Sequence, residues 1–208
     1  MSTPHVAVVG GGLAGLAAAL SCLDAGARVS LLEARARLGG ATWSAPMRGL
    51  TVDNGQHVFM RCCTAYRDFL ARLGVAGRVQ LQRRLAVPVL VPGAAPSWIR
   101  RAPLPAPAHL APSLLRFAPL SLPERLRAAV TARRLGALDP DDRALDRECL
   151  GDWLRAHGES ERSIERFWDL LIRPTLNLPA REASLALAAK VLVTGFLSDA
   201  GGADVGVA

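Results

Sequence analysis

Residues 5–33 read HVAVVGGGLAGLAAALSCLDAGARVSLLE, and this stretch decides the fold. Its first part, His5–Val9, is apolar and rich in valine, which predicts a short buried strand. Leu13–Ala25 is rich in alanine and leucine and precedes Gly26, which predicts a helix with a glycine at its C-terminus. Arg28–Glu33 predicts a second strand. A strand, a glycine turn, a helix and a strand form a complete βαβ unit of the usual size.

The turn between the first strand and the helix has the spacing of a phosphate-binding loop. Gly10, Gly12 and Gly15 form a GxGxxG pattern in which the first glycine allows the tight turn. The second lets the backbone approach a pyrophosphate, and the third lets the helix pack on the strand. The helix N-terminus, which includes Leu13 and Ala14, offers free N–H groups and a positive dipole. This loop predicts binding of a dinucleotide.

An acidic residue ends the second strand. Glu33 lies 18 residues after Gly15, where a carboxylate can accept hydrogen bonds from ribose hydroxyls. The alternative is a glycine turn of another α/β protein with Glu33 on its surface. FAD and NAD share this fingerprint, so the residues that follow decide between the two cofactors.

Residues 33–40 read EARARLGG and resemble the second nucleotide-binding motif of FAD enzymes in the amine oxidase and phytoene desaturase superfamily. The resemblance implies that Ala34 and Arg35 contact the cofactor, with Arg35 near its adenosine half. It also implies that the backbone of Gly39 and Gly40 runs close to the diphosphate and the ribityl chain. The other interpretation is a glycine turn flanked by solvated arginines. The cofactor expected from the resemblance is FAD.

A third motif, residues 53–57, reads DNGQH. Alone it is a turn with a lone histidine, which is more often structural than catalytic. In the superfamily an Asp-x-Gly segment at this place lines the isoalloxazine ring, so the resemblance implies that Gly55, Gln56 and His57 contact the flavin. This form is similar to that of the hydroxysqualene dehydroxylases, also called squalene-associated FAD-dependent desaturases. Ala41 stands where many superfamily members have an arginine, which argues against an amine oxidase specifically.

Further segments resemble the same family in order along the chain. They are Leu104–Leu110, Leu114–Ser121, Asp152–Gly158, Phe167–Asp169 and Thr175–Asn177. The family acts in squalene and hopanoid biosynthesis, which implies a long isoprenoid substrate and reductive removal of the hydroxyl of hydroxysqualene. The leaving hydroxyl calls for a general acid, for which His57 is the candidate and Asp53 the weaker one. Phe117, Trp153, Phe167 and Trp168 are candidates for an apolar substrate tunnel or for ordinary helix core.

The composition changes near Val87, and we expect two domains. Residues 1–86 are predicted to be the N-terminal part of an FAD-binding domain, and residues 87–208 the proline-rich, helical part of a substrate domain. The first part is predicted to continue with a loop, a hairpin or extended piece, a helix and a strand at Ala34–Ala45, Leu50–Met60, Thr64–Leu73 and Leu85–Val91. Prolines from Pro88 to Pro123 favour extended segments with short helices. Helices are predicted at Leu122–Leu135, Cys149–His157, Glu161–Leu171 (ended by Pro174) and Ala183–Leu197.

The end of the chain is predicted to be a glycine-rich tail, Gly201–Ala208, with no final element. The family has a second cofactor-binding segment and further strands, which are expected after the helical domain and are not found here. We therefore expect an α/β, Rossmann-like fold with its C-terminal half missing. Three alternatives to hydroxysqualene dehydroxylation stay open: a carotenoid desaturase, an amine oxidase, and a truncated, inactive fragment.

The composition limits the partners and the location. Lys and Arg number 25 against 18 Asp and Glu, a net charge of +7, and no basic run with interleaved aromatics suggests nucleic-acid binding. A basic surface that contacts an anionic membrane is the better use of this charge. The four cysteines form no CxxC pair and have no histidine at ligand spacing, so no metal site is expected. Glycines interrupt the apolar stretch Val6–Leu23 and no cation precedes it, so it is not expected to be a signal peptide. We expect a cytoplasmic protein that is peripheral to the inner face of the membrane, and the oligomeric state stays open.

Overall fold

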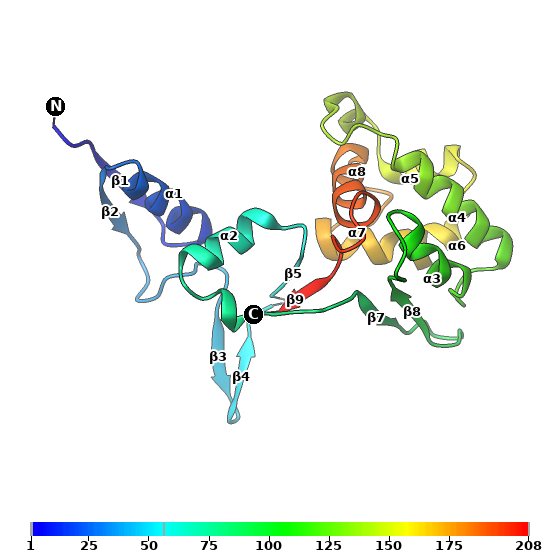
Figure 1. Cartoon of the computed structure of the whole chain (residues 1–208), viewed down its shortest axis with the longest axis horizontal. Coiled ribbons are helices and arrows are strands. Elements are labelled where there is room, and N and C mark those ends of the chain that lie inside the picture. Colours follow the sequence, from blue (N-terminus) through cyan, green and yellow to red (C-terminus); the bar gives the residue numbers. More distant parts are fainter. Residues whose placement is uncertain (1, 56, 208) are drawn as a thin grey trace. The chain divides into compact units, whose positions relative to one another are not determined.

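The computed structural model describes residues 2–55 and 57–207, which divide into two compact units (Figure 1). The first unit contains the described residues up to Val58 and Asp68–Arg78. The second contains Phe59–Arg67 and Val79–Val207. The domain boundary expected after residue 86 stays a prediction.

The first unit contains the predicted βαβ arrangement. Strand β1 (His5–Val9) pairs in parallel with β2 (Arg28–Leu32), and α1 (Leu13–Asp24) connects the two strands. Gly26 follows the helix with a φ of +80°, the left-handed conformation expected of a glycine after a helix C-terminus. The prediction of a Rossmann-like unit is therefore confirmed in this segment, with the helix one residue shorter than expected.

A hairpin follows, but it begins earlier than predicted. Strands β3 (Ser44–Met47) and β4 (Leu50–Asp53) pair antiparallel around a turn at Arg48 and Gly49. Both turn residues have positive φ, 49° and 81°, as a two-residue hairpin turn of type I′ requires. Ser44 was predicted to lie in a loop because its strand, SAPM, contains a proline and has no regular alternation.

The last described residues form a strand, so the prediction of a tail with no final element is wrong. Strand β9 (Val205–Val207) is the central strand of a three-stranded sheet, between β5 (Val58–Met60) and β6 (Gln80–Leu81). A Cβ on Gly206 would lie 2.4 Å from the Phe59 ring, so the glycine lets this ring lie against the strand. The pairing joins segments more than a hundred residues apart, and no local pattern reports such a pairing.

The second unit is mostly helical, as predicted. A hairpin, β7 (Ala86–Val89) with β8 (Ser97–Arg100), precedes the helices. The helices, with α2 shared between the units, are α2 (Thr64–Arg72), α3 (Ala111–Leu115), α4 (Leu122–Leu135), α5 (Leu150–Ala156), α6 (Glu161–Ser163), α7 (Asp169–Leu176) and α8 (Leu185–Leu192). A π-helical segment, Ile164–Trp168, joins α6 to α7, and a second one, Val193–Leu197, extends α8.

Helix α7 continues past Pro174, where the sequence predicted its end. The proline lies in the last turn, so its missing N–H removes one hydrogen bond near the terminus instead of breaking a long helix. The hydroxyl of Thr175 donates to the carbonyls of Leu171 and Ile172 at 3.0 and 2.9 Å. Asn177 then ends the helix in the left-handed conformation, with a φ of 56°.

The hydrophobic core lies in the second unit, where α7 and α8 pack together (Figure 1). Its largest fully buried side chains include Trp168, Leu135, Leu150, Leu154, Ile172, Leu185 and Leu192. In the described part of the first unit only Ala19 and Leu70 are buried hydrophobic residues. No helix among the described residues is long and apolar enough to cross a membrane.

Candidate functional site

The two glycine motifs lie side by side in the first unit. The amide of Gly39 donates to the carbonyl of Gly11 at 2.8 Å, and Gly12 and Gly39 form a parallel β-bridge. A Cβ on Gly40 would lie 2.9 Å from the Cα of Gly12. The backbones therefore touch at a place where any side chain would separate them.

The phosphate loop is tightly packed at Gly15, whereas the N-terminus of the helix that follows it is open. A Cβ on Gly15 would lie 1.9 Å from the carbonyl oxygen of Gly10, so the third glycine is required for the turn to pack on the helix. Gly12 is the N-cap of α1, no side chain among the described residues caps the helix, and no acidic residue lies in its first turn. Leu13 and Ala14 are exposed. The chain itself thus leaves the positive end of α1 available to an anion.

Glu33, predicted to accept hydrogen bonds from ribose hydroxyls, also forms hydrogen bonds with the phosphate loop and with the residues after β2. Its Oε2 accepts a hydrogen bond from the amide of Gly11 at 2.7 Å, and its Oε1 accepts one from the amide of Arg35 at 2.9 Å. The Arg35 and Gly11 amides hold the pKa of the Glu33 carboxyl below its usual range. Each carboxylate oxygen can accept a further bond, so ribose hydroxyls remain acceptable partners. Ala34 and Arg35 are exposed.

Two residues that hydrogen-bond to the loop around Gly40, Asn54 and Arg37, were not among the predicted site residues. The side-chain amide of Asn54 donates to the carbonyl of Ala41 at 2.7 Å, which links the third motif to the loop after Gly40. Arg37 donates to the carbonyl of Gly40 at 2.9 Å, and its guanidinium lies 4.8 Å from the centre of the Trp43 ring. Both residues belong to the quoted motifs, but their partners depend on the loop's path, which the sequence pattern does not specify.

His57 is held within its own turn. Its Nε2 lies 3.0 Å from Asn54 Oδ1, its Nδ1 lies 3.5 Å from Asp53 Oδ2, and its side chain is 18% exposed. Both contacts come from residues of the same turn, so Asp53 and Asn54 fix the orientation of the ring. Gly55 is exposed, and Gln56 lies outside the described residues. The roles of Gly55, Gln56 and His57 stay predictions.

The residues present fit the diphosphate and a ribose of a dinucleotide such as FAD. Three observations carry this conclusion: the touching glycine backbones, the uncapped helix N-terminus, and a carboxylate at the end of β2 with acceptor capacity left. Together they suit a diphosphate and a ribose. The structure thus assembles the first two motifs and Asn54 of the third on adjoining loops.

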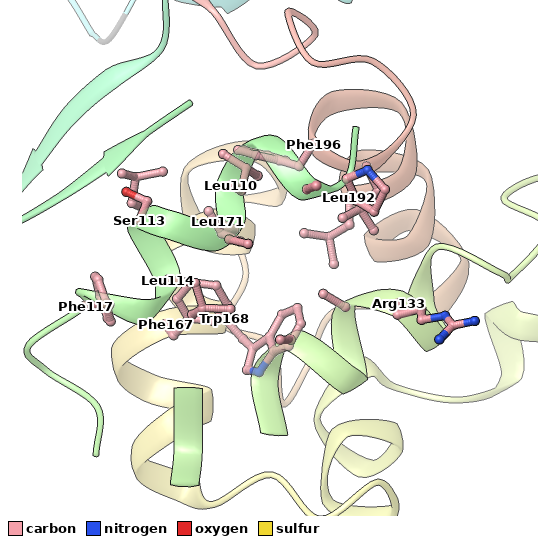
Figure 2. A pocket seen from close by; sticks show the side chains of 17 residues that line it. Leu110, Ser113, Leu114, Phe117, Arg133, Phe167, Trp168, Leu171, Leu192 and Phe196 are labelled. Atoms are coloured by element: carbon pink, nitrogen blue, oxygen red, sulfur yellow. The ribbon is translucent and has the colours of Figure 1, made fainter. Parts of the chain in front are cut away.

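The second unit contains an apolar cavity of about 320 Å³ (Figure 2). Its lining comes from β8, α3 and the residues on either side of α3, α4, α7, α8 and the two π-helical segments, and includes Leu110, Leu114, Phe117, Phe167, Trp168 and Phe196. Its polar members are Ser113, whose hydroxyl accepts from the amide of Arg100 at 2.8 Å, and Arg133, whose guanidinium Figure 2 shows pointing away from the other labelled side chains. Such a lining suits an apolar ligand.

The tunnel candidates divide between core and cavity. Phe117, Phe167 and Trp168 line the cavity, whereas Trp153 does not. Phe117 and Trp168 are each 1% exposed, so they also belong to the packed interior. Phe167 packs edge-to-face against both, with ring centres 5.6 and 5.2 Å apart. Both interpretations therefore apply to Phe117, Phe167 and Trp168: they are side chains of the packed interior that also form part of the cavity wall.

Known proteins share both the sequence and the fold. The family profile described as "Flavin containing amine oxidoreductase" matches residues 13–200. A zeta-carotene desaturase of Capsicum annuum is 30% identical over 176 residues, which cover 79% of this chain and 30% of that protein. A hydroxysqualene dehydroxylase of Zymomonas mobilis is 29% identical over 206 residues, which cover 92% of this chain and 44% of that protein.

The structure of cyclohexylamine oxidase from Brevibacterium oxydans superimposes with a TM-score of 0.61 at 23% identity. The match covers 100% of this chain and 46% of that one. The α/β fold of FAD-binding amine oxidases is thereby confirmed. The chain spans less than half the length of these three proteins.

Proposed function

The chain belongs to the flavin-containing amine oxidoreductase family, and from this premise we propose that it binds FAD and contributes to reductive removal of a hydroxyl from hydroxysqualene. Residues 10–15 and Gly39–Gly40 would hold the diphosphate, and Glu33 the adenosine ribose. FAD in its reduced form supplies a hydride. The crowded glycine backbones and the free α1 N-terminus support this part of the proposal.

The apolar cavity is the observation that carries the substrate class. A long isoprenoid has no charge and almost no polar group, and all residues of the cavity wall except Ser113 and Arg133 have aliphatic or aromatic side chains. A small amine would require a polar partner there, because an unpaired polar group in such surroundings is unfavourable. The cavity therefore favours a hydrocarbon substrate over an amine.

The choice of reaction rests on the relatives. The likeness to the Zymomonas mobilis dehydroxylase extends over 92% of this chain, and that to the Capsicum annuum desaturase over 79%. Desaturation of a carotenoid is the second candidate, because several zeta-carotene desaturases are 28–31% identical to this chain and their substrate is also apolar. In the proposed reaction the allylic C–O bond breaks, the hydroxyl leaves as water after receiving a proton, and a hydride takes its place on carbon.

The test has two stages. The purified chain is mixed with FAD, and retained flavin is measured by absorbance after gel filtration. It is then given hydroxysqualene with dithionite or zeta-carotene with a quinone acceptor, and products are identified by mass spectrometry. Retained flavin and formation of squalene are expected. A colourless protein would refute FAD binding, and conversion of the carotenoid alone would favour the desaturase.

His57 is proposed to give the proton to the leaving hydroxyl. Its two contacts with Asp53 and Asn54 fix the ring, and a positioned general acid is worth about a hundredfold in rate or more. We expect His57→Ala to retain flavin and to lose squalene formation by roughly that factor. His5→Ala, the matched control in the same unit, should keep its rate. Equal rates in both variants would remove His57 from the reaction.

A further inference from the structure

Helix α4 has two chemically different faces. One face packs into the core through Ala128, Thr131 and Leu135, which are at most 1% exposed. The opposite face carries an aliphatic row with one side chain per turn. Leu122, Leu126 and Val130 are 57%, 52% and 54% exposed. Because these three side chains are about half exposed, they bury little apolar surface in the core of the unit. Exposed aliphatic side chains that lie together in this way are typical of a surface that contacts a partner or a membrane.

Three arginines lie beside this row or at its end. At about 100° per residue, Arg127 and Arg134 lie along one side of it, and Arg133 follows in the last turn. All three are exposed, and none has a carboxylate within ion-pair distance among the described residues. Their charge is therefore not neutralised within the described chain.

No acidic residue of α4 lies on the face that carries the exposed row. The one acid of α4, Glu124, lies about 160° from Leu126 around the helix and is held by Ser121 and Ser160. The face thus contains leucine, valine, proline and arginine. It also contains a shallow hollow of about 330 Å³, lined in part by Pro123, Leu126, Val130 and Arg134.

We propose that this face of α4, the exposed row with its flanking arginines, docks on an anionic lipid surface. Aliphatic side chains beside arginines are typical of helices that lie in the membrane interface, where the row enters the acyl boundary and the arginines meet the headgroups. Arginine side chains are long enough to reach phosphates from beside the row. Figure 1 shows α4 at the margin of the helical unit, and a chain with a net charge of +7 is attracted to the same surface.

A protein partner is the less suitable occupant. Protein interfaces concentrate their binding energy in aromatic anchors that enter pockets, and the exposed face of α4 has no aromatic residue. The row of similar aliphatic side chains instead suits a fluid surface without fixed pockets. The proposal is independent of flavin binding and of the reaction.

The test measures co-sedimentation of the full chain with vesicles. Vesicles of phosphatidylcholine alone are compared with vesicles that also contain phosphatidylglycerol. The wild-type chain is expected to bind the anionic vesicles, to bind the neutral ones weakly, and to dissociate as salt is added.

Two variants separate the charge from the apolar row. Arg127→Gln with Arg134→Gln should weaken binding to anionic vesicles by roughly tenfold or more. Arg143→Gln with Arg147→Gln removes the same charge from exposed positions outside α4 and should have a much smaller effect. Leu126→Ser with Val130→Ser should also weaken binding, whereas Leu187→Ser, at a leucine of similar exposure on α8, should not. Circular dichroism checks that each variant keeps its helices.

Three results would overturn the proposal. The first is a wild-type chain that does not bind anionic vesicles. The second is equal loss in the two arginine pairs, which would show a general effect of net charge. The third is a row variant that binds vesicles normally but changes the oligomeric state in light scattering, which would assign the face to a second copy of the chain.

Discussion

Asp204 is completely buried, and its carboxylate forms ion pairs with two arginines. Arg101 forms a two-bonded contact with it, Nε to Oδ1 at 2.7 Å and Nη2 to Oδ2 at 2.9 Å, and Arg61 Nη2 lies 3.0 Å from Oδ2. The amide of Leu85 donates to Oδ1 at 2.7 Å. Burial alone would raise the pKa of Asp204, but the bonds from Arg101 and Leu85 outweigh it and hold the pKa below its usual range. One carboxylate therefore joins three distant segments of the second unit.

Asp204→Asn should destabilise the second unit strongly. The amide keeps the shape but leaves two arginines without their counter-charge, and breaking a buried ion pair in this way costs about 3–5 kcal/mol. Urea unfolding followed by circular dichroism at neutral pH measures the change. Asp141→Asn removes a carboxylate from an exposed pair with Lys190 and should cost about 1 kcal/mol or less. Similar losses in the two variants would contradict the role given to Asp204.

At the residue scale, what the sequence predicted depends on how local the constraint is. The need for a glycine at position 15 was predictable, because the residue on which it packs, Gly10, is only five positions earlier in the chain. The position of Glu33 was predictable, whereas its bonds to Gly11 and Arg35 were not, because they depend on how the loop closes. Asp204 gave no signal at all, since its partners lie 103 to 143 residues away in the chain.

Helix α4 begins with a capping box that also reaches another helix. Glu124 Oε2 accepts bonds from the amide and the hydroxyl of Ser121 at 2.8 and 2.7 Å. Its Oε1 accepts the hydroxyl of Ser160, the N-cap of α6, at 2.7 Å. The Ser160 and Ser121 bonds lower the pKa of Glu124 from 4.5 to about 2. A negative charge is also favourable beside two helix N-termini.

Protonation of Glu124 should therefore cost stability in acid. Its pKa is lower in the folded chain than in the unfolded one, so its contribution is complete above pH 4.5 and is lost as the pH falls toward 2. Glu124→Gln keeps the shape without the charge, and we expect it to be less stable than wild type by about 1 kcal/mol at neutral pH, with the difference shrinking as the pH falls toward 2. Urea unfolding across this range measures the difference. Glu165→Gln, at an exposed helical position, should follow the wild type throughout. A constant gap between wild type and Glu124→Gln would refute the titration.

At the element scale, periodic segments were predicted well and paired segments poorly. The βαβ unit and α4 follow from apolar periodicity and from their terminal residues, Gly26 and Pro123, which act within a few residues. Strand β9 was missed because three residues carry no period. It exists because β5 and β6 flank it. Helix α7 extends beyond Pro174 because a proline in the last turn removes only one helical hydrogen bond. The rule that a proline ends a helix does not take its position within the helix into account.

At the scale of the whole molecule, the two units differ in how much they bury. The described part of the first unit has Ala19 and Leu70 as its buried hydrophobic residues, while Val9, Leu32 and Leu38 are 83%, 55% and 54% exposed. Nearly all of the hydrophobic core belongs to the second unit. Since hydrophobic burial is the dominant favourable contribution to folding, the first unit is expected to open more readily than the second.

If the first unit binds FAD, the cofactor should stabilise that unit selectively. At a hundredfold excess over its dissociation constant a ligand adds about 2.7 kcal/mol, which corresponds to roughly hundredfold slower amide exchange through opening of the unit. Hydrogen exchange followed by mass spectrometry should therefore show strong protection of β1 and α1 on addition of FAD, and little change in α8.

Two glycine variants make this experiment specific. Gly15→Ala places a Cβ 1.9 Å from the carbonyl oxygen of Gly10, so it should abolish the protection. Gly77→Ala belongs to the same unit, and its Cβ would meet no atom within 4 Å, so it should respond to FAD as the wild type does. Protection of α8 to the same degree as α1 would mean that the two units open together. Protection that persists in Gly15→Ala would place the cofactor away from the phosphate loop, because that variant removes the tight turn on which the predicted site depends.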